Sequence, residues 1–508
     1  MNFQRSSGIL LHPTSLPGRF GIGDLGDEAF AFIDFLAASG QSFWQVLPLG
    51  PTGYGDSPYQ CFSAFAGNTL LISPGRLVDR GLLAADDLSH APRFPMRIDF
   101  GQVIEFKRAL LERAFDNFKT TNDNALRDEF NKFCHENGWW LEDYALFRAL
   151  KAAHGGVCWI DWEPQFVQRD EDALGAARGA LREKIEAERF YQYLFFSQWW
   201  ALKAYCSERG IRIIGDAPIF VAYDSADVWS HPEMFKLDRD GRPIVIAGVP
   251  PDYFSRTGQL WGNPIYNWDA MRATGFRWWT DRLRGTLQTV DVLRIDHFRG
   301  FAACWEIPGG DETAERGQWV DVPGRELFIT LRNTLGELPI IAEDLGVITP
   351  DVEALRDDFG FPGMRVLQFA FRGDGRNQDL PHNHIRNCIV YTGTHDNDTT
   401  VGWFHSKAGK GSTRNAEDIE RERAYVLKYL NSGGREIHWD VIRAAWASVA
   451  NTAIAPLQDL LGLGSRARMN LPASQQGNWQ WRFRREALTK KVSERLREMT
   501  ELYGRHQI

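Results

Sequence analysis

The stretch QTVDVLRIDHFRG, residues 288–300, carries the pattern from which the fold can be argued. Residues 292–295 are apolar or β-branched apart from Arg294, and a polar cluster follows them, which predicts a short buried strand. Because strand side chains alternate between faces, Arg294 and Asp296 share one face, and the guanidinium favours the ionised carboxylate. The same pattern also fits a structural alternative, in which Asp296 caps the following helix and Arg294 is its ion partner.

Three more segments repeat the order of an apolar strand followed by a carboxylate. IRIIGD ends at Asp216, PIIAED contains Glu343, and CIVYTGTHD ends at Asp396. A further strand pattern without a terminal acid, GMRVLQFA, occupies residues 363–370. Helical stretches between such strands indicate parallel βαβ units.

Acids gathered at the C-terminal ends of several strands are typical of the active site of a (β/α)8 TIM barrel. We therefore predict the α/β class and this barrel. A doubly wound open sheet is the alternative fold, but no Gly-rich phosphate fingerprint follows any of the strands.

The remaining sequence predicts one catalytic domain over residues 1–508, without a separate C-terminal β domain. Insertions are expected near 60–205, 225–275 and 400–445. The first lies between strands 2 and 3 and is mainly helical, with apolar spacing near 3.6 residues at 106–118, 126–137, 141–153 and 181–207.

The second insertion contains residues 247–264, which read as neither strand nor helix. Prolines and glycines stiffen and bend this stretch, which predicts a loop that displays Tyr253, Phe254 and Trp261. Long structureless loops in compact enzymes are usually lids or binding loops.

Composition excludes several function classes. The 58 Lys and Arg against 66 Asp and Glu give a net charge of -8, and no basic run occurs, so nucleic acid and membrane are poor partners. Six cysteines without paired spacing, and no apolar leader or spanning segment, predict a cytoplasmic protein. The 19 Trp against 13 Tyr favour a carbohydrate ligand, since sugar rings stack on aromatic faces.

The chemistry predicted from the residues is carboxylate catalysis, because no P-loop, H-E-x-x-H motif or nucleophile elbow is present. Retaining glycosidic cleavage uses two carboxyl groups about 5–5.5 Å apart, and neighbouring strands are about 4.8 Å apart. Asp296 and Glu343, on consecutive strands, are therefore the predicted pair. Arg294 keeps Asp296 anionic as a nucleophile, and the apolar run before Glu343 raises its pKa, which suits an acid.

Long motifs in a fixed order resemble one known family. They are HPTSLP at 12–17, GYGDSPYQ at 53–60, GDAPIFVA at 215–222, PPDYFS at 250–255, QLWGNP at 259–264, RIDHFRG at 294–300, AEDLG at 342–346 and GTHDN at 393–397. The chain resembles, over nearly its whole length, the 4-alpha-glucanotransferases called amylomaltases or disproportionating enzymes, which are relatives of the α-amylases.

The resemblance implies retaining transfer of an α-1,4-glucan segment from a maltooligosaccharide, starch or glycogen donor to the 4-OH of an acceptor. Asp296 would be the nucleophile, Glu343 the general acid/base, and Asp396 the carboxylate that holds the distorted donor sugar. The substrate-binding residues implied are Tyr59, Asp216, Arg294, His297 and His395 on the donor side, Tyr253, Phe254 and Trp261 on the acceptor side, with Ser57, Gln259 and Asn470, and Tyr54 in an outer groove. No metal or organic cofactor is implied, and a monomer or weak homo-oligomer is expected.

Three other functions fit parts of the pattern. A plain α-glucan hydrolase would use the same acids with water as acceptor. A non-catalytic glucan-binding protein would gain nothing from an acid/base pair. An aldolase-like barrel would place a lysine at a strand end, and the strand ends identified here carry none.

Overall fold

An eight-stranded parallel barrel forms the centre of the molecule. The computed structural model describes residues 4–251, 256–408, 415–472, 474 and 476–506. The strands adjoin in the order β10-β11-β12-β1-β2-β3-β6-β9, and Ala342 N donates to Pro362 O at 2.9 Å, which joins β9 to β10 and closes the ring. Their bounds are β1 Ser6–Leu10, β2 Phe43–Gln45, β3 Arg212–Pro218, β6 Val292–Asp296, β9 Ile340–Ala342, β10 Gly363–Val366, β11 Cys388–Tyr391 and β12 Thr452–Pro456.

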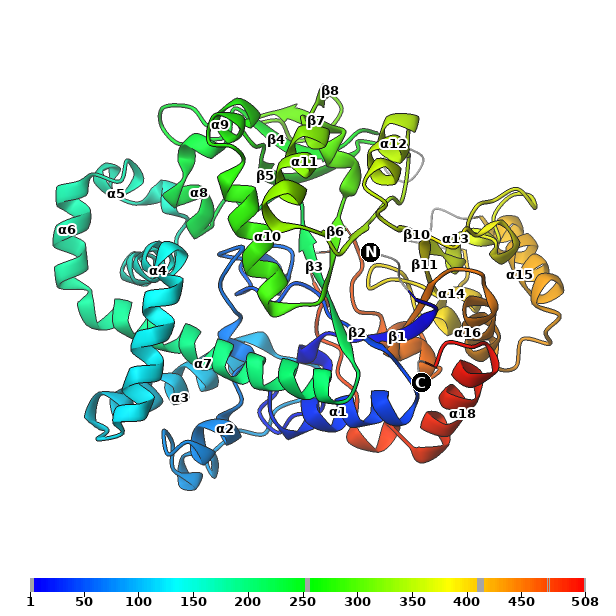
Figure 1. Cartoon of the computed structure of the whole chain (residues 1–508), viewed down its shortest axis with the longest axis horizontal. Helices are drawn as coiled ribbons and strands as arrows, with labels where there is room; N and C mark the ends of the chain where they lie inside the picture. The colour runs from blue at the N-terminus through cyan, green and yellow to red at the C-terminus, as the bar shows by residue number, and fades with distance from the viewer. Residues whose placement is uncertain (1–3, 252–255, 409–414, 473, 475, 507–508) are drawn as a thin grey trace.

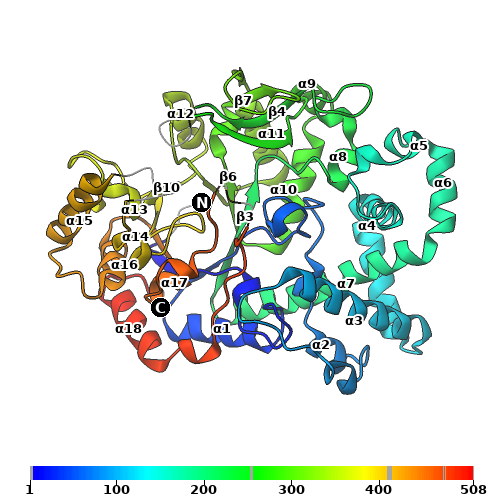
Figure 2. The same cartoon turned by 180° about the vertical axis from the view of Figure 1, so that it is seen from behind.

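The predicted (β/α)8 barrel with a helical insertion between strands 2 and 3 is confirmed. Figures 1 and 2 show the insertion, coloured cyan, on one side of the barrel and the orange α15 on the other. The helices are α1 Asp27–Ala38, α2 Pro74–Asp79, α3 Phe100–Thr120, α4 Asn124–Ala153, α5 Pro164–Val167, α6 Glu171–Ala180, α7 Arg182–Glu208, α8 Ala226–Ser230, α9 Trp268–Ala273, α10 Arg277–Thr289, α11 Gly324–Leu335, α12 Pro350–Asp358, α13 Leu367–Ala370, α14 Thr400–Phe404, α15 Ala416–Leu430, α16 Ile437–Ala447, α17 Leu457–Leu460 and α18 Lys490–Leu502.

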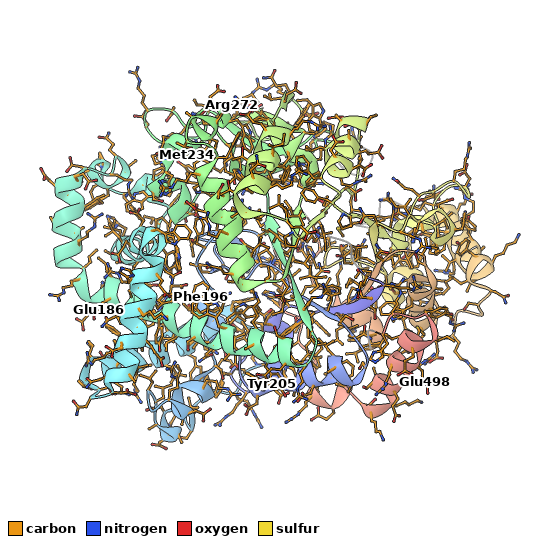
Figure 3. The ribbon with its side chains drawn as sticks, in the orientation of Figure 1. Glu186, Phe196, Tyr205, Met234, Arg272 and Glu498 are labelled. Carbon is orange, nitrogen blue, oxygen red and sulfur yellow. The ribbon has the colours of Figure 1, made fainter. Side chains whose placement is uncertain are left out.

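The insertion differs from the sequence expectation at one point. The two helices predicted at 126–137 and 141–153 are one helix of 30 residues, α4. Gly138 lies inside it with open space around its Cα, and a single interior glycine costs only about 1 kcal/mol. Packing of α4 against α7 through aromatic side chains, including Phe133 on Phe196 at 5.7 Å between ring centroids, offsets that cost. Figure 3 labels Phe196 on α7.

The prediction of a structureless stretch at 247–264 is wrong at both of its ends. Strands β4 Val245–Val249 and β5 Gln259–Pro264 pair antiparallel. They belong to a four-stranded sheet with β7 Ala303–Pro308 and β8 Gln318–Asp321, in the order β5-β4-β7-β8. Tyr253 and Phe254 lie between the paired strands and outside the described residues.

The two ends of the chain meet at one seam of the barrel. The first strand, β1, pairs with the last, β12, from Ser6 opposite Thr452 onward. Arg505 is fully buried behind this seam and donates to backbone carbonyls of both segments, including Ser6 O at 2.8 Å and Ala450 O at 3.0 Å. No helix in the described part of the chain is both long and apolar enough to cross a membrane.

Candidate active site

A buried arginine joins two carboxylates from neighbouring strands. Strand register places Asp216 of β3 directly beside Arg294 of β6. The Arg294 guanidinium donates to both oxygens of Asp216, at 2.8 and 2.7 Å, and to Asp296 Oδ1 at 2.9 Å. The capping alternative is wrong, because the turn that follows, Phe298–Phe301, has His297 at its cap position and no side-chain cap. The hydrogen bond from Arg294 holds the Asp296 carboxylate in a fixed orientation.

Glu343 follows β9 on the adjacent strand and faces the same end of the barrel. Its Oε2 accepts from His297 N at 2.6 Å and its Oε1 from Leu345 N at 3.0 Å. Desolvation, followed by the negative charge of Asp296, raises the pKa of Glu343 to about 8. The carboxyl group can therefore carry a proton at neutral pH, as a general acid requires.

Asp396 stands beyond the end of β11 and remains open to a ligand. Its side chain is 47% exposed. Asn470 Nδ2 donates to Asp396 Oδ1 at 2.6 Å, and His395 Nε2 lies 3.3 Å from the same oxygen. Arg468 donates to the Asp396 backbone carbonyl at 2.5 Å. The carboxylate is thus held from behind while its exposed portion stays available.

An aromatic wall adjoins these acids. Tyr59 Oη donates to Asp216 Oδ2 at 2.8 Å, and its ring stacks on His395 with centroids 5.0 Å apart. Trp479 lies 6.0 Å from both rings. Three aromatic groups thus stand beside four carboxylates, an arrangement that suits a sugar ring, whose C–H faces stack while its hydroxyls donate.

Comparison with known proteins assigns this chain to a family. The family model for 4-alpha-glucanotransferase matches residues 11–489. The chain belongs to the 4-alpha-glucanotransferase family. The resemblance drawn from the sequence motifs is thereby confirmed.

Individual relatives cover the glucanotransferase chain almost completely. It is 53% identical to the 4-alpha-glucanotransferase of Synechocystis sp., over 99% of this chain and 98% of that one. Identity to the Thermus thermophilus 4-alpha-glucanotransferase is 51%, over 99% of each. The solved structure of the Streptococcus agalactiae amylomaltase, in complex with acarbose, superposes with a TM-score of 0.94 at 44% identity, covering 99% of this chain and 100% of the other.

The glucanotransferase fold brings together most of the residues that the sequence singled out. Trp261 lies edge-on to His297 at 4.7 Å and donates to Gln259 Oε1 at 3.2 Å. Ser57 Oγ accepts from Tyr59 N at 3.2 Å, which orients the loop that carries Tyr59. Burial lowers the pKa of His297 to about 4, so that the imidazole is neutral at neutral pH.

Among the predicted residues that the structure describes, Tyr54 does not join the cluster. Tyr54 is 73% exposed on its own turn, and Tyr253 and Phe254 lie outside the described residues. Sequence reasoning missed Trp479 and Arg468 as parts of the site. The stretch NWQWR at 478–482 was the available signal for Trp479, but nothing local indicates which tryptophan faces the acids.

Among the residues that the structure describes, no group of three or more His, Cys, Asp or Glu side chains could hold a metal ion.

Proposed function

We propose that this protein transfers α-1,4-glucan segments between maltooligosaccharide, starch or glycogen chains by retaining double displacement. The observation that carries the proposal is the pairing of an Arg294-bound Asp296 with Glu343, whose pKa is raised to about 8. Arg294 binds and orients the carboxylate of Asp296, whereas the raised pKa lets Glu343 carry a proton at neutral pH. When two neighbouring carboxyl groups have such different environments, one can act as the nucleophile and the other as the acid.

In the first half-reaction, Asp296 attacks the anomeric carbon and the glycosidic C–O bond breaks. Glu343 gives its proton to the departing 4-oxygen, and a glucosyl ester forms on Asp296. Esterification removes the negative charge that raises the pKa of Glu343. With that charge removed the pKa of Glu343 falls, so its carboxylate stays deprotonated and can take the proton of the acceptor 4-OH, whose oxygen attacks the same carbon and releases Asp296. Two inversions leave the α-configuration unchanged.

The proposed roles of the other residues follow from their contacts. Asp396, exposed and supported by Asn470 and His395, would hold hydroxyls of the distorted donor sugar. The wall of Tyr59, His395 and Trp479 would stack against the same ring. These assignments rest on geometry and on the family resemblance.

The experiment that tests transfer against hydrolysis uses maltotriose as the only carbohydrate. We expect glucose and longer maltooligosaccharides, with the total of reducing ends nearly constant, because each bond broken is replaced by another. Product chromatography and a reducing-end assay measure both quantities. Only shorter sugars, with reducing ends rising, would instead identify a hydrolase.

Trp261 is proposed to favour a sugar acceptor over water. It is the described aromatic of the 247–264 segment, and it stands against His297 beside the catalytic pair. We expect Trp261→Ala to raise the fraction of glucosyl units lost to water by up to roughly tenfold, the value of one stacked aromatic. The same prediction stands for Tyr253→Ala and Phe254→Ala. The hydrolysis-to-transfer ratio on maltotriose measures it, with the cleavage rate of α-glucosyl fluoride as control. A parallel fall of both rates with an unchanged ratio would make Trp261 a structural residue.

The organisation as one catalytic domain, with insertions near 60–205, 225–275 and 400–445, is part of this proposal. A cytoplasmic location and a monomeric or weakly oligomeric state remain predictions.

A further inference from the structure

A cleft outside the cluster of catalytic acids lies between α4 of the helical insertion and the helices α8 and α10. It has a volume of about 250 Å³ and is bounded by α4, α8, α10 and the loop that follows β2. Figure 1 shows α4, α8 and α10 on the insertion side of the barrel, and Met234, labelled in Figure 3, is one of the lining residues. The aromatic and acidic residues that line the cleft include Phe65, Trp139, Trp278, Asp143, Asp227 and Asp281.

Three aromatic rings form one side of the cleft. Phe65 meets Trp139 edge-to-face at 4.9 Å and Trp278 at 6.2 Å. Trp139 is 50% exposed, whereas its neighbour Trp140 is buried. A tryptophan that is half exposed and yet held by a partly buried aromatic partner is a pre-positioned flat surface, which loses little conformational entropy when a ligand stacks on it.

The polar groups of the cleft include both acceptors and donors, because His231 and Arg277 line it together with the three aspartates. Asp143 and Asp281 each have an ion pair, with Arg169 at 2.8 Å and Arg284 at 2.6 Å, which holds them in fixed positions. Asp227 is buried deeper in the same wall. Sugar hydroxyls both donate and accept hydrogen bonds, so they match this mixture of carboxylates and nitrogen donors.

The cleft shares a loop with the catalytic site. Phe65 lies six positions after Tyr59 in the sequence, and the Tyr59 hydroxyl donates to Asp216. The loop is fixed on the cleft side by Asp227, which accepts from Ala64 N at 2.8 Å, and by Ala226 N, which donates to Phe62 O at 2.8 Å. One rigid loop therefore contributes an aromatic residue to each of the two places.

We propose that this cleft binds α-1,4-glucan chains as a second site, through stacking on Trp139 and hydrogen bonds to the acidic side chains. The inference rests on the proposed glucan transfer for its choice of ligand. Its consequence is avidity: a long chain bound at the cleft raises the local concentration of chain ends at the catalytic acids. A short donor that fills only the catalytic cluster gains nothing.

The test compares Trp139→Ala with the matched control Trp200→Ala. Trp200 is a second half-exposed tryptophan of the insertion, at 39%, which packs on Phe196 at 5.5 Å and does not line the cleft. For Trp139→Ala we expect the KM for long amylose to rise roughly three- to tenfold, with kcat and KM on maltotriose unchanged. Trp200→Ala should change neither. Trp139→Leu, which keeps an apolar contact with Phe65 but no flat ring, should behave as Trp139→Ala.

A binding measurement separates this inference from the proposed function. Calorimetric titration of each variant with long amylose, in an Asp296→Asn background, requires no turnover. Weaker amylose binding on loss of Trp139 supports the cleft even if the maltotriose products identify a hydrolase. Equal amylose binding by all variants, an equal loss with Trp200→Ala, or a parallel loss on maltotriose would each overturn the proposal.

Discussion

Replacing Asp296 by asparagine is expected to lower turnover on maltotriose by about 10⁴-fold or more, because no other group can replace a nucleophile. The fold should survive the change. Asparagine has nearly the same shape, and the buried Arg294 keeps both oxygens of Asp216 as partners. Initial rates measure the loss, and a thermal unfolding curve close to that of the original protein is the control.

The position of the covalent intermediate gives the more specific test of the same role. In Glu343→Gln, the second half-reaction lacks its base, so a glucosyl group delivered from α-glucosyl fluoride should accumulate on the enzyme. Mass spectrometry of the digested protein should find the label on the peptide that contains residues 292–300. A label on Asp216, the other carboxylate bound by Arg294, would contradict the assignment.

The second large effect is expected at Glu343 and depends on pH. The acid must carry its proton when the donor bond breaks, and its pKa is about 8. We therefore expect kcat/KM on maltotriose to fall about tenfold per pH unit above that value.

Glu343→Gln should lower the rate at neutral pH by about 10²- to 10⁴-fold. Fluoride leaves with little help from an acid, so Glu343→Gln should still carry out the first half-reaction on α-glucosyl fluoride. The rate of that half-reaction in the variant should no longer fall at alkaline pH, and this missing fall is the lost alkaline limb. Retention of that limb in the variant would assign it to another group.

The same raised pKa makes the free energy of unfolding depend on pH, because Glu343 binds its proton more tightly in the folded state than in the unfolded state. The folded state binds the proton up to about pH 8, whereas the unfolded carboxyl releases it near its usual 4.5. The stabilising effect of the bound proton is therefore fully present below pH 4.5 and is lost as the pH rises to about 8. Between these values the free energy of unfolding should fall for the original protein relative to Glu343→Gln. Denaturant unfolding of both across the window measures the difference, and parallel curves would contradict it.

The catalytic acids could be predicted from the sequence because their positions follow from local rules. Residues two apart in a strand share a face, and this rule alone places Arg294 behind Asp296, as their 2.9 Å contact confirms. An apolar run before Glu343 predicted its raised pKa, and desolvation is indeed the largest cause. The sharing of Arg294 with Asp216 follows only from the register of β3 against β6, which the sequence does not state.

Features that depend on distant partners could not be predicted. Strands β4 and β5 contain glycine and proline and read as a loop because β7, the partner that stabilises β4, comes some 60 residues later. Trp479 reaches Tyr59 across more than 400 residues of sequence. The second cleft likewise combines residues from three helices and a loop. In each case, long-range packing decides which of several exposed-looking residues faces the site.

The seam between β1 and β12 has a consequence for how the chain folds during synthesis. Ser6 and Thr452, which pair across it, are 446 residues apart. At roughly 5–20 residues per second, the first strand waits about 20–90 s on the ribosome before its partner is made. During that time its outer edge is an open template for wrong pairing or for a chaperone. Arg505, made later still, donates to Ser6 O in β1 and to Ala450 O just before β12. Closure of the barrel is thus a late event in the life of each nascent chain, and its yield should depend on what protects that edge in the interval.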